Sequence, residues 1–159
     1  MDGELVEASQ NSGRTRCNRR CEWLCPYRYV SVGLRGQISY VDGRYNESIA
    51  MLEACLDGMK KCRYTMSASV FRNALAKALC ANGDARRALV VCEEAIQAIE
   101  INGDELYLPM LRMTKADALS AIEEHEASMS SLREALVLAK KQGAVAFASQ
   151  IERTGRLES

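Results

Sequence analysis

The stretch that decides the fold is GDARRALVVCEEAI, residues 83–96, because the chain carries two further copies of its pattern. One copy, GRYNESIAMLEACL, lies 40 residues upstream at 43–56, and the other, EEHEASMSSLREAL, lies 40 residues downstream at 123–136. Such a period is typical of an array of helical repeats. The residues that coincide at this offset include Leu52, Cys92 and Leu132.

The composition favours an all-α protein of one domain. The 159 residues include 21 basic and 21 acidic side chains, so the net charge is zero. A neutral chain has no global attraction to nucleic acid or to an anionic membrane. No apolar run approaches the roughly 20 residues that span a bilayer, and residues 1–16 lack the apolar core of a signal peptide. We therefore expect a cytoplasmic protein with neither a nucleic-acid nor a membrane partner.

The N-terminal segment, residues 1–27, differs from the rest and is predicted to be disordered or atypical. One hypothesis for its origin is a rearranged or misassigned gene start. It contains a C-x3-C-x3-C pattern, and Pro26 is expected to end any helix there at Cys25. Zinc requires four ligands, and the only histidine is His125, far along the chain. We therefore predict no metal and no other cofactor, with only a weak candidate set in Cys17, Cys21 and Cys25.

Residues 28–155 are predicted to form the repeat domain. Apolar residues recur at helical spacing, and glycines separate the segments. Asn46 is the expected N-cap of the second helix, Ser67 or Ser69 caps the third, and the fifth starts at either Asp104 or Leu108. For five helices the sequence predicts both a start and an end, at 30–42, 46–61, 85–101, 126–142 and 144–153.

The helix pairs resemble tetratricopeptide repeats. That family places a small residue in the first helix of each pair, then small, large and small residues 12, 16 and 19 positions later. The resemblance implies an antiparallel helix-pair solenoid of about three pairs plus a C-terminal helix. The matching positions are Gly36, Ser48, Leu52 and Cys55; Ala76, Ala88, Cys92 and Ala95; and Ala116, Ser128, Leu132 and Ala135.

Residues 34–150 more narrowly resemble the C-terminal repeats of bacterial multidomain ATPase transcriptional regulators and adenylate-cyclase-type ATPases. The resemblance rests on runs such as NALAKALCANGDARRALVVCEEAI and LREALVLAKKQGA. No G-x-x-x-x-G-K-[ST] phosphate loop occurs in the chain. The resemblance implies a detached or truncated scaffold that binds a protein or peptide. The alternatives are a module that senses a small molecule and a non-catalytic fragment of a cyclase-like enzyme.

No arrangement of catalytic side chains is recognisable, so an enzyme is not expected. Glu93 and Glu134 are interpreted as solvated side chains, and Cys55, Cys80 and Cys92 as free thiols among apolar helix residues. The resemblance places binding residues on the concave side, along the first helix of each pair, and the open ends of the array offer a route to self-association. The predicted groove residues are Gln37, Tyr40, Asn73, Lys77, Met110, Met113 and Asp117.

Overall fold

The computed structural model describes residues 25–65, 67–102 and 105–153, and over these ranges the chain is helical, with no strand. The all-α prediction is confirmed. A short 3-10 helix, η1 (Glu105–Tyr107), precedes the third helix pair. The α-helices are α2 (Cys25–Val41), α3 (Tyr45–Lys61), α4 (Ala68–Ala81), α5 (Ala85–Asn102), α6 (Leu108–Ala121), α7 (His125–Lys141) and α8 (Val145–Glu152).

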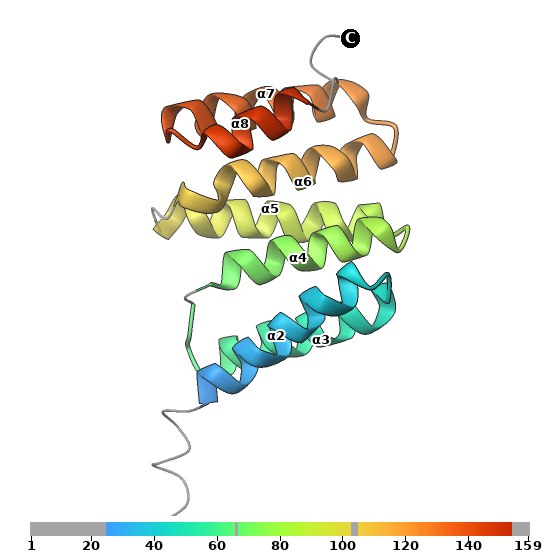
Figure 1. The fold of residues 1–159 in the computed structure, drawn as a ribbon, viewed down its shortest axis with the longest axis vertical. Coiled ribbons are helices and arrows are strands. Elements are labelled where there is room, and N and C mark those ends of the chain that lie inside the picture. Colours follow the sequence, from blue (N-terminus) through green and yellow to red (C-terminus); the bar gives the residue numbers. More distant parts are fainter. Residues whose placement is uncertain (1–24, 66, 103–104, 154–159) are drawn as a thin grey trace, which may run out of the picture.

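The helices are stacked in chain order as the pairs α2/α3, α4/α5 and α6/α7, followed by α8 (Figure 1). Each second helix packs against its own first helix and against the first helix of the next pair. The first helices also contact one another in succession, α2 with α4, α4 with α6 and α6 with α8. Adjacent pairs therefore share a continuous set of contacts.

The helix starts differ from the sequence predictions more than the helix ends do. Pro26 lies in the first turn of α2, while the preceding segment, in which it was expected to end a helix, lies outside the described residues. This is the turn in which proline is tolerated, because the N–H groups there have no helical partner. Asn46 is not an N-cap, since Arg44 holds that position. Ser67, one of the two predicted alternatives, is the N-cap residue of α4, but its side chain forms no capping hydrogen bond. The start near Leu108, the second of the two predicted alternatives, is confirmed.

The turn inside each helix pair repeats with the same 40-residue period as the sequence. Gly43, Gly83 and Glu123 have φ values of +76°, +86° and +65°. In each turn the next residue donates its N–H to the carbonyl five positions earlier, as in Arg44 to Ser39 at 2.8 Å. Glycine adopts this left-handed conformation without the steric cost that a Cβ brings, so the third turn carries strain that the other two avoid.

The twelve small and large positions of the repeat are all buried. Ser48 Oγ donates a hydrogen bond of 2.8 Å to the carbonyl of Gly36, and Ser128 Oγ donates one of 2.8 Å to Ala116. Ser48 and Ser128 are two 40-residue repeats apart, and Ala88 occupies the equivalent position in the central pair. A Cβ on Gly36 would lie 2.9 Å from Leu52 Cγ, so the first pair needs glycine for its close approach.

Candidate functional site

The first helices bring the predicted groove residues onto three neighbouring elements. Because α4 contacts both α2 and α6, side chains at one repeat position can form a row across the three helices. Gln37, Lys77 and Asp117 occupy such a position, 40 residues apart, and we call them the polar ladder. Gln37 and Lys77 are half-buried, and Asp117 is exposed. Lys77 forms no ion pair with any described residue.

Asn73 does not lie on an open surface. Only 4% of the residue is exposed, and its Oδ1 accepts a hydrogen bond of 2.8 Å from Thr114 Oγ1 on α6. The interpretation of Asn73 as a side chain that holds a peptide backbone therefore needs correction, because its amide oxygen already joins α4 to α6. Leaving such a buried group without a partner costs about 1–3 kcal/mol, so Asn73 is a packing residue.

The remaining predicted groove residues are half-buried and partly engaged in packing. The ring of Tyr40 lies 5.8 Å from the ring of Tyr45 at the start of α3. Met113 packs against the core cluster formed by α6, α7 and α8, as expected for a methionine at helical spacing. Met110 is half-buried near the start of α6. These three residues can border a bound chain, but the polar ladder supplies the hydrogen-bonding groups.

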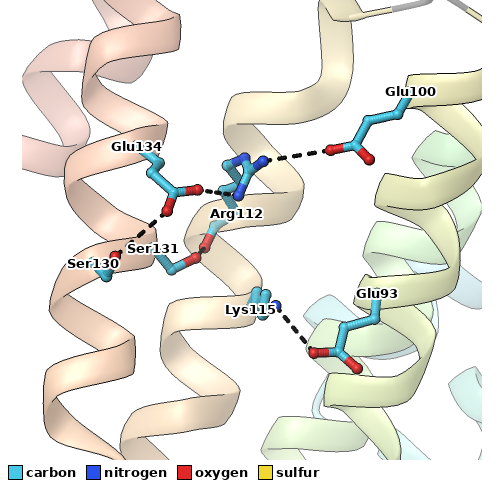
Figure 2. Close-up of polar contacts among 7 residues, drawn as sticks. All are labelled: Glu93, Glu100, Arg112, Lys115, Ser130, Ser131 and Glu134. Atoms are coloured by element: carbon cyan, nitrogen blue, oxygen red, sulfur yellow. Dashed lines mark hydrogen bonds and ion pairs between the residues drawn. The ribbon is translucent and has the colours of Figure 1, made fainter.

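A second polar arrangement lies where α6 is held between α5 and α7 (Figure 2). Arg112 forms ion pairs with Glu134 on α7 and with Glu100 on α5, the latter at 3.6 Å, and Lys115 pairs with Glu93 at 3.0 Å. The Arg112 side chain is only 19% exposed. Sequence reasoning treated Glu93 and Glu134 as simply solvated, because their cationic partners are distant in the sequence. These contacts hold α6 between α5 and α7.

The helix cysteines are free and are held in their neutral form. Burial is the main cause that raises the pKa of Cys80 to about 11 and that of Cys92 to about 12, and the carboxylate of Asp117 adds to both shifts. Burial also raises the pKa of Cys55. Since the thiolate is the nucleophile, these thiols are unsuited to covalent catalysis.

The described part of the chain contains no group of three His, Cys, Asp or Glu residues that could hold a metal ion. Cys17 and Cys21 lie outside the described residues, and the structure places only the backbone of Cys25. His125 is exposed at the start of α7. The weak metal candidate therefore remains a sequence hypothesis.

A cleft of about 320 Å³ opens between the first and second helix pairs, where the chain passes from α3 to α4. Its volume is at the lower end of the range for small-molecule sites. Arg72 borders the cleft, is half-buried, and forms no ion pair with a described residue. Sequence reasoning missed this feature because no motif marks it. The lining is Leu56, Asp57, Met59, Lys60, Tyr64, Thr65, Ala68, Arg72, Leu75, Val91 and Glu94.

None of the helices in the described ranges combines the length and the apolar character needed to cross a bilayer. Comparison with known proteins adds no relative. No family model, no curated protein and no solved structure matches this chain. The arguments about function therefore rest on the repeat pattern and on the geometry of the helices.

Proposed function

We propose that the protein is a non-enzymatic scaffold that binds an extended peptide of a protein partner across α2, α4 and α6. The observation that carries the proposal is the polar ladder, which repeats Gln37, Lys77 and Asp117 at one position of three adjacent helices. A tetratricopeptide-like solenoid with these first helices on its concave side is part of the same proposal. The burial of all twelve repeat positions supports it.

The ladder has the chemistry that a peptide backbone requires. The Gln37 amide can donate and accept hydrogen bonds, the Lys77 ammonium can bind a carboxylate or a carbonyl, and the Asp117 carboxylate can accept an N–H. A half-buried ammonium without a partner carboxylate favours a ligand that brings one. We therefore assign Lys77 as the anchor for an acidic side chain or for the C-terminal carboxylate of the peptide, with Met110 as an adaptable apolar neighbour.

The setting implied by the sequence resemblance belongs to the same proposal. The scaffold would act in the bacterial cytoplasm as a detached or truncated part of an ATPase-type transcriptional or signalling regulator. The peptide would then come from another component of that regulator. No enzymatic step is assigned to this chain.

Peptide display on the immobilised full chain, followed by calorimetry with the selected peptide, tests the proposal. We expect the peptides to share a carboxylate, and we expect Lys77→Glu to weaken binding at least tenfold, about 1.4 kcal/mol. Arg133→Glu is the matched control, because it reverses an exposed cation on α7. Equal affinities for the parent and Lys77→Glu would remove the ladder from the binding site.

The cleft between α3 and α4 favours a second candidate function, the sensing of a small molecule. Its wall includes Leu56, Leu75 and Val91, with the unpaired Arg72 guanidinium beside them. An anion with an apolar body suits this combination, since guanidinium binds carboxylate or phosphate groups in a bidentate manner. A carboxylate or phosphate amphiphile that raises the melting temperature of the parent, but not of Arg72→Met, would support this function over peptide binding.

A further inference from the structure

The outward face of α2 exposes an apolar stripe along the whole helix. Its members are Tyr27, Leu34, Ile38 and Val41, which are 68%, 51%, 59% and 81% exposed. The spacings of seven, four and three residues place them on one side of the helix. Gly33 and Gly36 lie on the opposite side, buried toward the rest of the molecule. Scattered exposed hydrophobic residues are ordinary on protein surfaces, whereas a continuous stripe indicates a contact surface.

The equivalent positions on α4 and α6 show what covers this face elsewhere in the array. Positions equivalent to Leu34 and Ile38 are Ala74 and Ala78 on α4 and Thr114 and Ala118 on α6. Ala78, Thr114 and Ala118 are at most 1% exposed, and Ala74 is half-buried. They are covered because a helix pair precedes α4 and another precedes α6. In the described structure, α2 presents the same face without a preceding pair.

The outward face of α2 is also not a polar cap. Terminal repeats of helical arrays usually carry a polar outer face, which keeps the array soluble. Ser31 follows that rule, since the equivalent residues Phe71 and Leu111 are buried. Leu34 and Ile38 do not follow it, because both are larger and more apolar than their equivalents. This mixture of polar and apolar residues is typical of an interface.

We propose that a second copy of this chain covers the stripe, with the two α2 helices packed antiparallel about a two-fold axis. Two-fold dimers are the commonest soluble oligomers, and each uses one self-complementary surface twice. Charge supports this arrangement. Arg28, in the first turn of α2, and Asp42, directly after its last residue, are exposed along one edge of the stripe. Asp42 pairs with Arg44 of its own copy at 2.8 Å, but half of its side chain stays exposed for a second cation. An antiparallel pair brings each Arg28 to the Asp42 of the other copy, whereas a parallel pair keeps these two residues at opposite ends of the interface.

The register of this dimer follows from the stripe. A two-fold axis midway between Tyr27 and Val41, near Leu34, superposes the apolar residues of both helices. With a helical rise of about 1.5 Å per residue, Arg28 and the other copy's Asp42 then differ by only about 3 Å along the axis. The same register puts Arg35, which is exposed on the same edge, beside its own copy. Arg35 therefore makes an unfavourable contact between like charges in this register.

Sedimentation equilibrium of the full chain under reducing conditions tests the proposal. We expect a concentration-dependent monomer–dimer equilibrium. We expect Leu34→Glu and Ile38→Glu each to raise the dimer dissociation constant at least tenfold, because each buries two carboxylates per dimer. Val137→Glu is the control, since Val137 is a single exposed hydrophobic residue on α7 and is 66% exposed. Circular dichroism checks that every variant keeps its helix content.

Charge variants distinguish the antiparallel two-fold dimer from unspecific association. Arg35→Gln should tighten the dimer several-fold, whereas Arg28→Asp should weaken it several-fold, and Asp42→Arg added to Arg28→Asp should restore it. A chain that stays monomeric at all concentrations would overturn the proposal, and the stripe would then be covered by another segment or partner. A dimer that responds equally to Val137→Glu and Leu34→Glu, or that is insensitive to Arg35→Gln, would overturn it as well.

Discussion

The junction between α3 and α4 and the junction between α5 and α6 join successive helix pairs in different ways. At the first junction the chain leaves a cleft of about 320 Å³. At the second, Ile96, Ile99 and Leu111 form one buried cluster, and the Thr114–Asn73 hydrogen bond and the Arg112 ion pairs lie nearby. Successive helix pairs can therefore meet around a cleft or around a buried cluster, depending on a few side chains and on the connector.

The connectors explain part of this difference. The chain between α3 and α4 has left-handed residues at Arg63 and Ser67, with φ values of 51° and 66°. The chain before α6 instead forms the 3-10 helix η1, and the buried Leu108 and Pro109 follow it. The connector before α6 therefore leads into buried apolar residues, whereas the connector before α4 lines the cleft.

The largest predicted effect concerns the leucines of the two junctions. Leu111→Ala should lower the free energy of unfolding by about 2–5 kcal/mol, since the side chain is fully buried. Leu75→Ala should cost less, because Leu75 borders the cleft and is 5% exposed. Urea denaturation of both variants measures the difference. Equal losses would show that the first junction is as tightly packed as the second.

A somewhat smaller effect is predicted for the buried hydrogen bond between α4 and α6. Thr114→Val keeps the shape of the side chain but leaves Asn73 Oδ1 without its donor, which should cost about 1–3 kcal/mol. The double variant Asn73→Leu with Thr114→Val should recover part of the loss. A double-mutant cycle in chemical denaturation gives the coupling energy, and additive losses would mean that the bond contributes nothing.

Alkaline pH should destabilise the protein through its buried thiols. The folded pKa of Cys92 is raised from 9.0 to about 12, mainly by burial, so the unfolded chain loses this proton first as the pH rises. The stabilisation is complete below pH 9 and declines above it, by about 1 kcal/mol at pH 10. Cys92→Ala should flatten the stability profile between pH 8 and about 10.5 more than Cys55→Ala does. If the free energy of unfolding of Cys92→Ala depended on pH as steeply as that of the parent, the effect could not be assigned to Cys92.

The smallest effects are expected in the turns inside the helix pairs. Gly83→Ala should lower the free energy of unfolding by about 1 kcal/mol, because alanine is strained in a left-handed backbone. A steric clash does not add to this cost, since no atom lies within 4 Å of the added Cβ. Glu123→Gly should stabilise the third pair by less than about 1 kcal/mol, because glycine also gains entropy in the unfolded chain. Thermal denaturation checks the opposite signs of the two shifts.

Much of the helical framework was predictable from the sequence. Gly43, Gly83 and Gly143 gave helix ends close to those observed, because a left-handed residue ends a helix locally. The starts were harder to predict, since the N-cap residues of α3, α4, α6, α7 and α8 form no side-chain capping hydrogen bond. Before α5, by contrast, Asp84 Oδ1 accepts one of 3.3 Å from the Arg87 N–H. The start of α2 at Cys25, with Pro26 in its first turn, depends on backbone geometry that composition does not reveal.

The candidate sites were less predictable because they depend on contacts between distant residues. The repeat offset correctly placed Asn73 on the first helix of its pair, but its burial depends on Thr114, 41 positions away. Arg112 and Glu134 are separated by 22 positions, so no local pattern joins them. The cleft needs residues of three helices and a connector, and it follows from how two pairs fit together.

The sequence by itself determined the helices, their 40-residue repeat and the small residues at which they pack, because turn conformation and side-chain size act over a few positions. The tertiary structure alone decided which polar groups are available. It buried Asn73, paired Glu93 with Lys115, and left Lys77 and Arg72 without carboxylate partners among the described residues. Burial and ion pairing depend on distances between helices, and those distances are fixed only when the pairs are stacked.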